Sequence, residues 1–124
     1  MDNGVLAKIA DVDSAGRTQT DFADVELRIR FERPPGNYFF FAVRQGVGGA
    51  YTAQWHKADV ERMPPGDHEL IIVCKGDAVT ATLDGRPHAV ERWGDNPPKA
   101  GALQFNAVAG GMLRIKSIEM RDPR

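Results

Sequence analysis

Polar and aromatic side chains alternate with apolar ones along three segments that the sequence predicts to be strands, residues 38–44, 50–56 and 101–108. Successive side chains of a strand point to opposite faces, so the apolar set would fill a core and the other set would face outward. The outward set combines aromatic rings with amide, imidazole and guanidinium groups: Tyr38, Phe40, Arg44, Gln54, His56, Gln104 and Asn106. On one shared sheet these groups suit a ligand with apolar C–H patches and many hydroxyls, which is a carbohydrate.

Each member of this outward set has a chemical role in the carbohydrate hypothesis. Arg44 would orient hydroxyl or carboxylate oxygens through its planar fork of donors. Gln54 and Gln104 would donate to and accept from sugar hydroxyls. Tyr38 or Phe40 would stack on a sugar ring.

The same alternation is also typical of a sheet face that simply meets solvent. Phe40 fits that interpretation least, because an exposed phenyl ring among polar neighbours marks a contact with a ligand, a further segment or a partner chain. His56 is the one member of the set that exchanges protons near neutral pH, so it is the candidate acid or base if the protein is an enzyme. Trp93 is either a rim aromatic or a plug at the end of the fold, and the sequence leaves both open.

Other residues that could do chemistry point to no cofactor. His68 and His88 lie near predicted strand starts or turns without a partner at metal-ligand spacing, and zinc needs three or four converging ligands. Calcium is a weaker alternative, for which four carboxylates could supply oxygens: Asp11, Asp13, Asp21 and Asp24. We expect these four to lie in solvated turns, because no EF-hand-like loop surrounds them. The lone Cys74 lies in an apolar run and is expected to be a buried, structural thiol.

The composition is that of an ordinary globular domain, with 42% hydrophobic and 27% charged residues. A net charge of −1 provides no overall field that would attract nucleic acid. No apolar run approaches the roughly 20 residues that span a bilayer, so membrane insertion is not expected. The first residues show no secretion signal.

Short strands separated by turn residues account for most of the chain. Beyond the three segments above, the pattern predicts strands at residues 5–10, 24–32, 68–75, 78–83, 86–92 and 112–121, with a loop at 57–67. Asp84-Gly85 predicts a type I′ hairpin turn. The segments 101–108 and 112–121 are expected to form a last pair around Gly110-Gly111. This spacing predicts an all-β fold, a two-layer antiparallel β-sandwich.

Several of these segments also carry a family resemblance. Residues 24–31 read Asp-Val-Glu-Leu-Arg-Ile-Arg-Phe, Gly36-Asn37 precedes a Phe-rich stretch ending at Arg44, and residues 51–54 read Tyr-Thr-Ala-Gln. Further along come Lys75-Gly76, Leu-Asp-Gly at 83–85, Gly-Ala-Leu-Gln at 101–104 and the closing run 113–120. In this order they resemble the 3-keto-disaccharide hydrolase family, a branch of the concanavalin-A-like lectin/glucanase jelly rolls.

The resemblance implies a jelly-roll fold and a carbohydrate ligand. It does not carry catalysis over, because Thr52 stands where the family's "Y-E-x-Q" segment has a carboxylate, and glycoside cleavage usually needs two carboxyl groups. The family's usual segment resembling "LFNGKDLSGW" has no counterpart here, so residues 1–124 are expected to be one jelly-roll domain, excised from a longer chain or reduced. Relatives are commonly exported, which implies an exported or periplasmic parent.

The sequence thus favours a carbohydrate-binding jelly-roll domain whose catalytic competence is doubtful. The alternative is a non-catalytic protein–protein interaction domain of a larger protein. An exposed sheet edge would favour a homodimer under either hypothesis.

Overall fold

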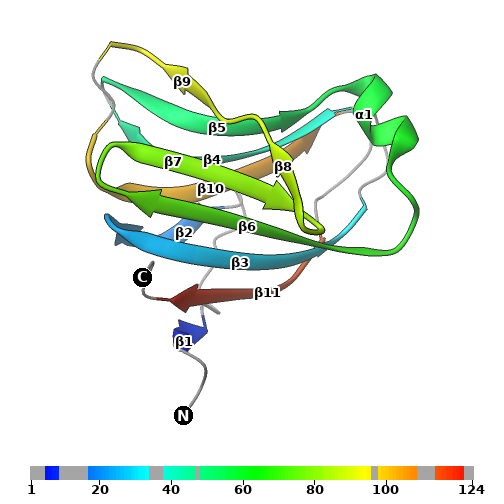
Figure 1. The fold of residues 1–124 in the computed structure, drawn as a ribbon, viewed down its shortest axis with the longest axis horizontal. Coiled ribbons are helices and arrows are strands. Elements are labelled where there is room, and N and C mark those ends of the chain that lie inside the picture. Colours follow the sequence, from blue (N-terminus) through cyan, green and yellow to red (C-terminus); the bar gives the residue numbers. More distant parts are fainter. Residues whose placement is uncertain are drawn as a thin grey trace.

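The computed structural model describes residues 5–8, 17–33, 38–46, 48–95, 98–108 and 114–121. They form two antiparallel sheets that pack face to face (Figure 1). The six-stranded sheet has the order β1-β11-β3-β6-β7-β8 and the five-stranded sheet the order β2-β10-β4-β5-β9. The strands are β1 (Val5–Lys8), β2 (Arg17–Phe22), β3 (Val25–Glu32), β4 (Tyr38–Gly46), β5 (Gly49–Trp55), β6 (Asp67–Lys75), β7 (Ala78–Leu83), β8 (Arg86–His88), β9 (Glu91–Trp93), β10 (Gly101–Val108) and β11 (Arg114–Arg121).

The core lies between the sheets, where the apolar half of each alternating strand meets its counterpart. Phe31 of the six-stranded sheet packs against Phe39 and Phe41 of the five-stranded sheet, with ring centroids 5.6 and 5.3 Å away. Trp55 stacks on Phe39 at 4.7 Å. These rings are almost fully excluded from water, and burial of each such side chain contributes about 1.5–3 kcal/mol.

The predicted two-layer antiparallel sandwich is confirmed, as are the predicted inward sets of the three site-bearing strands. Their buried members are Phe39, Phe41, Val43, Ala53, Trp55, Leu103 and Phe105, with Tyr51 half-buried against them. Cys74 is also buried as expected, and burial raises the pKa of its thiol to about 11. The type I′ turn is present, because Asp84 and Gly85 both have positive φ, 51° and 84°.

Four local predictions were wrong. Residues 17–22 form β2 although no strand was predicted there, because Arg-Thr-Gln-Thr-Asp-Phe has no apolar alternation; Asp21 therefore lies in a strand and not a turn. The predicted loop contains a short helix, α1 (Lys57–Arg62). The backbone N–H of His56 donates to Asp59 Oδ2 at 3.0 Å at its start. Val60 is buried and anchors the helix.

The other two wrong predictions concern which sheet a strand joins. Residues 86–92 are two strands, because β8 pairs with β7 in one sheet and β9 with β5 in the other. Pro87 has no N–H to donate, which suits an edge strand that ends early. The last two strands do not pair with each other, since β10 lies between β2 and β4 while β11 lies between β1 and β3.

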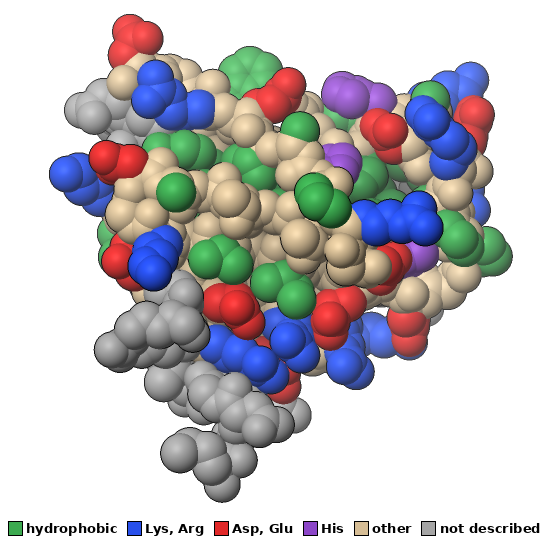
Figure 2. Space-filling view, viewed as in Figure 1, with side chains coloured by type: hydrophobic (Ala, Val, Ile, Leu, Met, Phe, Trp, Pro, Cys, Tyr) green, Lys and Arg blue, Asp and Glu red, His purple; other side chains and the backbone are tan. Residues whose placement is uncertain are grey.

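The outer faces of the two sheets differ. Charged side chains gather over β3 and β11 on the six-stranded face (Figure 2). There Glu69 Oε2 lies 3.9 and 3.3 Å from the Nε atoms of Arg28 and Arg30. The outer face of the five-stranded sheet instead carries the candidate site. Within the described segments, no helix has the length and apolarity needed to cross a membrane.

Candidate functional site

The register of the five-stranded sheet brings the predicted outward residues together. Phe40 of β4 lies opposite Gln54 of β5, and Ala42 lies between Thr52 of β5 and Gln104 of β10. Directly opposed residues of an antiparallel pair share a face, with Cβ atoms about 4.5–5.5 Å apart. These side chains therefore line one continuous surface over three strands.

This surface is hollowed into a groove of about 480 Å³. Its lining residues come from four strands: Tyr38, Phe40, Ala42, Gly49, Ala50, Thr52, Gln54, Trp93 and Gln104. Small residues lie among aromatic and amide side chains in this lining, so the groove offers rings beside hydrogen-bonding groups. The structure thus brings Tyr38, Phe40, Gln54 and Gln104 together, as the alternation predicts.

A directed hydrogen-bond chain runs across one wall of the groove. The Tyr38 hydroxyl donates to Gln54 Oε1 at 2.7 Å, and Gln54 Nε2 donates to Glu91 Oε2. The Tyr38 ring also contacts Phe40, with centroids 6.1 Å apart. Burial, and after it the negative charge of Glu91, raises the pKa of Tyr38. The amide of Gln54 is therefore held in one orientation between a phenol and a carboxylate.

Trp93 supplies the other wall. It lies on the edge strand β9 opposite Ala50, and 54% of its surface is exposed, the most of any large hydrophobic side chain described. Two glycines hold this strand close to β5: a Cβ on Gly49 would lie 1.7 Å from the carbonyl oxygen of Trp93, and one on Gly94 would lie 2.2 Å from that of Gly48. Of the two alternatives that the sequence left open for Trp93, the structure shows the rim position.

Glu91 was missed by sequence reasoning. It lies opposite Thr52 in the sheet, but the sequence placed it in a single strand from 86 to 92. The signal that would have found it is the change of sheet between β8 and β9, which alternation alone does not reveal.

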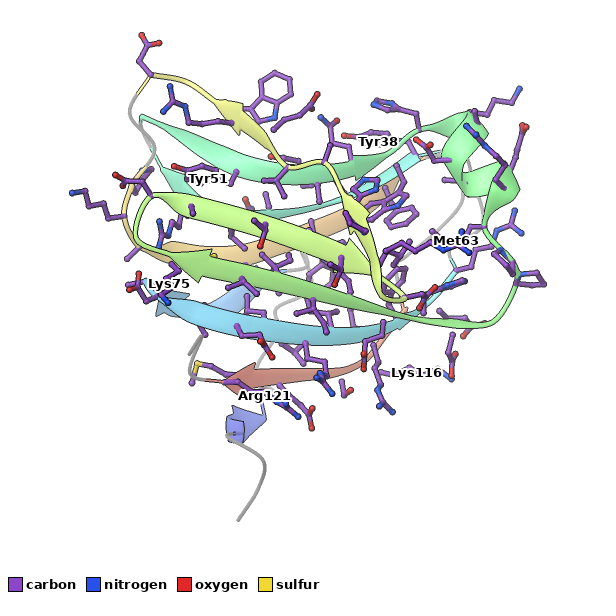
Figure 3. All side chains as sticks on the ribbon, viewed as in Figure 1. Tyr38, Tyr51, Met63, Lys75, Lys116 and Arg121 are labelled. Atoms are coloured by element: carbon purple, nitrogen blue, oxygen red, sulfur yellow. The ribbon has the colours of Figure 1, made fainter. Side chains whose placement is uncertain are left out.

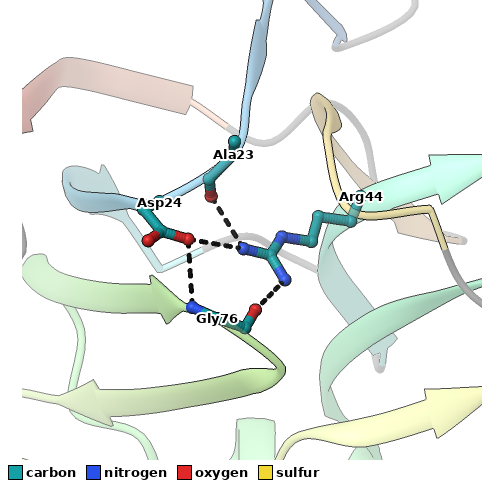
Figure 4. A network of polar contacts seen from close by, with 4 residues as sticks. All are labelled: Ala23, Asp24, Arg44 and Gly76. Carbon is teal, nitrogen blue, oxygen red and sulfur yellow. Dashed lines mark hydrogen bonds and ion pairs between the residues drawn. The ribbon is translucent and has the colours of Figure 1, made fainter.

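Arg44 does not belong to this surface, so its predicted outward orientation was wrong. Only 2% of Arg44 is exposed. Its Nη1 donates to Gly76 O at 2.5 Å and its Nη2 to Ala23 O at 2.9 Å, and Nη2 lies 3.4 Å from Asp24 Oδ1 (Figure 4). The reason is a break in the strand period: Arg44 has φ 52°, and the register of β4 with β5 shifts between Val43 and Gly46. The guanidinium consequently bridges the two sheets.

His56 and Asn106 stand apart from the other predicted site residues. His56 is exposed just beyond β5. Its ring centroid lies 5.2 Å from that of Tyr38. Figure 3 shows Tyr38 at the α1 end of the sheet. His56 thus flanks the groove without lining it, and its role as an acid or base stays a prediction. Asn106 pairs with Phe40 through the backbone, but its side chain lies outside the described part of the structure.

The weaker calcium candidates do not come together in what the structure describes. Asp24 Oδ1 accepts from the backbone of Gly76 and contacts Arg44. Asp11, Asp13 and the side chain of Asp21 lie outside the described residues. Within the described ranges, no three His, Cys, Asp or Glu side chains are placed to hold a metal ion.

A second cavity, of about 510 Å³, lies at the end of the sandwich beside α1 and the β7–β8 hairpin. His88 forms part of its wall, stacks on Trp55 at 4.1 Å and contacts the Gln54 carbonyl through Nε2. His68 is buried there, with Nδ1 2.6 Å from Asp84 Oδ2 and Nε2 2.7 Å from Pro64 O. Both ring nitrogens are thus committed to structural partners.

We expect Asp84 to make stability depend on acid pH. Burial raises the pKa of Asp84, but hydrogen bonds from His68 and from the Glu69 backbone lower it by a larger amount. The pKa of Asp84 therefore lies below its ordinary value. A lowered folded-state pKa stabilises the domain above the ordinary value, near pH 4, and that stabilisation is lost as pH falls through the folded value. Asp84→Asn keeps a side chain that tolerates the positive φ and should be less stable than wild type at pH 7, with the gap in stability closing as pH falls below the ordinary pKa of an aspartate. Urea unfolding of both proteins across this range measures the gap; a gap independent of pH would contradict the assignment.

No protein-family model and no curated protein matches the chain. Solved structures do. Galectin LEC-6 of Caenorhabditis elegans matches with a TM-score of 0.50 and 11% identity, over 88% of this chain and 98% of that one. The carbohydrate binding module CBM66 of Bacillus subtilis matches with a TM-score of 0.50 and 12% identity, over 92% of this chain and 88% of that one. The fold is a jelly roll. That prediction is confirmed, while the narrower resemblance to the 3-keto-disaccharide hydrolases has no matching family model behind it.

Proposed function

We propose that this jelly roll is a carbohydrate-binding domain and that its site is the groove on the five-stranded sheet. The observation that carries the proposal is the composition of that groove, in which Trp93, Tyr38 and Phe40 surround the amides of Gln54 and Gln104. A sugar ring stacks its C–H face on aromatic rings and directs its hydroxyls to amides. One of the similar structures, CBM66, is itself a carbohydrate binding module, which supports the same function.

The shape of the surface favours this proposal over a protein-interaction domain. A flat apolar patch around Phe40 would suit a protein partner, whereas Phe40 is half-buried in the wall of a groove. Self-association through a sheet edge stays a prediction; the edge strands are β1 and β8 in one sheet and β2 and β9 in the other.

Hydrolysis is the second candidate, and one observation favours it. Glu91 lies directly opposite Thr52, the position at which the 3-keto-disaccharide hydrolases carry a carboxylate. Glycoside cleavage usually uses two carboxyl groups, and among the side chains described in and around the groove Glu91 is the one carboxylate. We therefore propose binding as the primary function and reserve cleavage for a direct assay of sugar release from 3-keto-glycosides.

Truncating Trp93 should weaken sugar binding without unfolding the domain. The intact chain is screened on a glycan array, and the dissociation constant of the best ligand is measured by calorimetry. For Trp93→Ala we expect the dissociation constant to rise about tenfold, because a stacked ring contributes about 0.5–1.5 kcal/mol beyond the area it covers. Ile71→Ala is the matched control, since Ile71 is half-buried on the outer face of the other sheet. Equal affinity of Trp93→Ala and wild type would reject the groove as the site.

A further inference from the structure

Glu91 borders the groove through its hydrogen bond with the lining residue Gln54, and no cation neutralises its charge among the described residues. Glu91 is exposed and accepts a hydrogen bond from the neutral amide of Gln54. None of the ion pairs found in the described ranges includes it. The groove lining itself contains neither lysine nor arginine, because Arg44 has turned into the interior. A ligand in the groove therefore lies beside an unpaired carboxylate.

The direction of the hydrogen-bond chain adds to this polarity. A carboxylate can only accept, so the NH₂ of Gln54 must face Glu91 and its carbonyl oxygen must face Tyr38. The hydroxyl hydrogen of Tyr38 is thereby committed to Gln54. What this wall offers to a ligand is mostly acceptor capacity, on the Tyr38 oxygen and the Glu91 carboxylate, with one remaining N–H of Gln54. The complementary ligand group is a donor with positive charge.

Trp93 also favours a ligand with a positively charged group. Glu91 and Trp93 lie two residues apart on β9, opposite Thr52 and Ala50, so they share the groove-facing side of the strand. The exposed indole of Trp93 attracts a cation over its face, and Trp is the best ring for this contact. A cationic group on the ligand would thus meet a carboxylate and an indole on one short strand.

We propose that the groove selects saccharides that carry a free amine, such as glucosamine units, over neutral saccharides, and that it excludes uronic acids. This inference rests on the proposed carbohydrate-binding function and names its ligand class. The ammonium group of an amino sugar has three donors and a positive charge, which match the acceptors of Tyr38 and Glu91. A uronate would place a second negative charge beside Glu91 and lose affinity by repulsion.

Three oligosaccharides of equal length separate the relevant charges: a glucosamine tetramer, an N-acetylglucosamine tetramer and a galacturonate tetramer. Their dissociation constants are measured by calorimetry at about pH 6, below the pKa of an ordinary amine, so that the free amines of the glucosamine tetramer carry positive charge. The glucosamine tetramer should bind about tenfold more tightly than its acetylated counterpart, and the galacturonate tetramer should bind most weakly. Added salt should reduce the differences in affinity among the three tetramers, because it screens the charge interactions. The imidazole of His56 lies beside Tyr38; a positive charge on it would repel an ammonium group, so His56 cannot be the source of a preference for amino sugars.

Glu91→Gln supplies the decisive comparison, since it keeps the shape of the side chain and removes its charge. The ratio between the two glucosamine-based affinities should fall from about ten to about one in this variant. A wild-type ratio near one, or a ratio unchanged by Glu91→Gln, would overturn the inference and leave the proposed function standing. Failure of all three tetramers to bind, together with a blank glycan array, would overturn both.

Discussion

Arg44→Met should destabilise the domain by about 3 kcal/mol, because hydrogen bonds to a charged group contribute about 1.5–3 kcal/mol each and a broken buried pair costs more. The guanidinium of Arg44 connects β4 to the β6–β7 turn of the other sheet through the Gly76 carbonyl, and to the β2–β3 connection between the sheets through the Ala23 carbonyl. Asp24 adds less, since 59% of its side chain is exposed. Methionine keeps an unbranched apolar stem and removes the guanidinium donors.

Urea unfolding measures this loss, and two further variants keep it specific. Arg44→Lys retains the charge but replaces the planar fork by one ammonium group, so it should recover only part of the stability. Arg86→Met makes the same substitution at an exposed arginine and should change the free energy of unfolding by less than about 0.5 kcal/mol. An unfolding midpoint of Arg44→Met equal to that of wild type would show that the bridge contributes nothing.

Gly49→Ala should open one side of the groove by displacing β9. A Cβ at this position would lie 1.7 Å from the Trp93 carbonyl oxygen, which is backbone and cannot rotate away, and the φ of Gly49 is +139°. The strand that carries Glu91 and Trp93 must therefore separate from β5. We expect ligand affinity to fall by about tenfold, as in Trp93→Ala, because the same stacking ring is lost.

Gly66→Ala is the matched control for this prediction. Gly66 also has a positive φ, +106°, but nothing lies within 4 Å of its Cβ position. This variant should lose about 1–3 kcal/mol of stability to backbone strain and still bind the ligand with wild-type affinity. Stability and affinity are measured on both variants; full affinity in Gly49→Ala would show that β9 does not form part of the site.

The alternation of side chains was enough to predict both the sandwich and much of the groove. A period of two assigns each residue of a strand to one of two faces, so Phe39 and Trp55 could be placed in the core and Gln54 and Gln104 outside it. The period fails where the backbone leaves the extended region. Arg44, with φ 52°, was consequently assigned to the wrong face.

Alternation also does not say which sheet a strand joins. The chain passes from one sheet to the other between β8 and β9, within a segment that the sequence presented as one strand. Glu91 was therefore not placed opposite Thr52, and the position of Trp93 could not be decided. The polar strand β2 had no apolar alternation to reveal it. Long-range pairing, which no local pattern encodes, accounts for these differences.

NMR mapping tests most directly whether a sugar binds in the groove of the five-stranded sheet. The ¹⁵N-labelled chain is titrated with the tightest-binding glycan of the array. We predict the largest shifts at the indole N–H of Trp93 and at the side-chain amides of Gln54 and Gln104. Signals from Ile71, on the other sheet, should stay unchanged. Shifts confined to the six-stranded face or to the second cavity around Arg86, or no shifts with any glycan, would contradict the account.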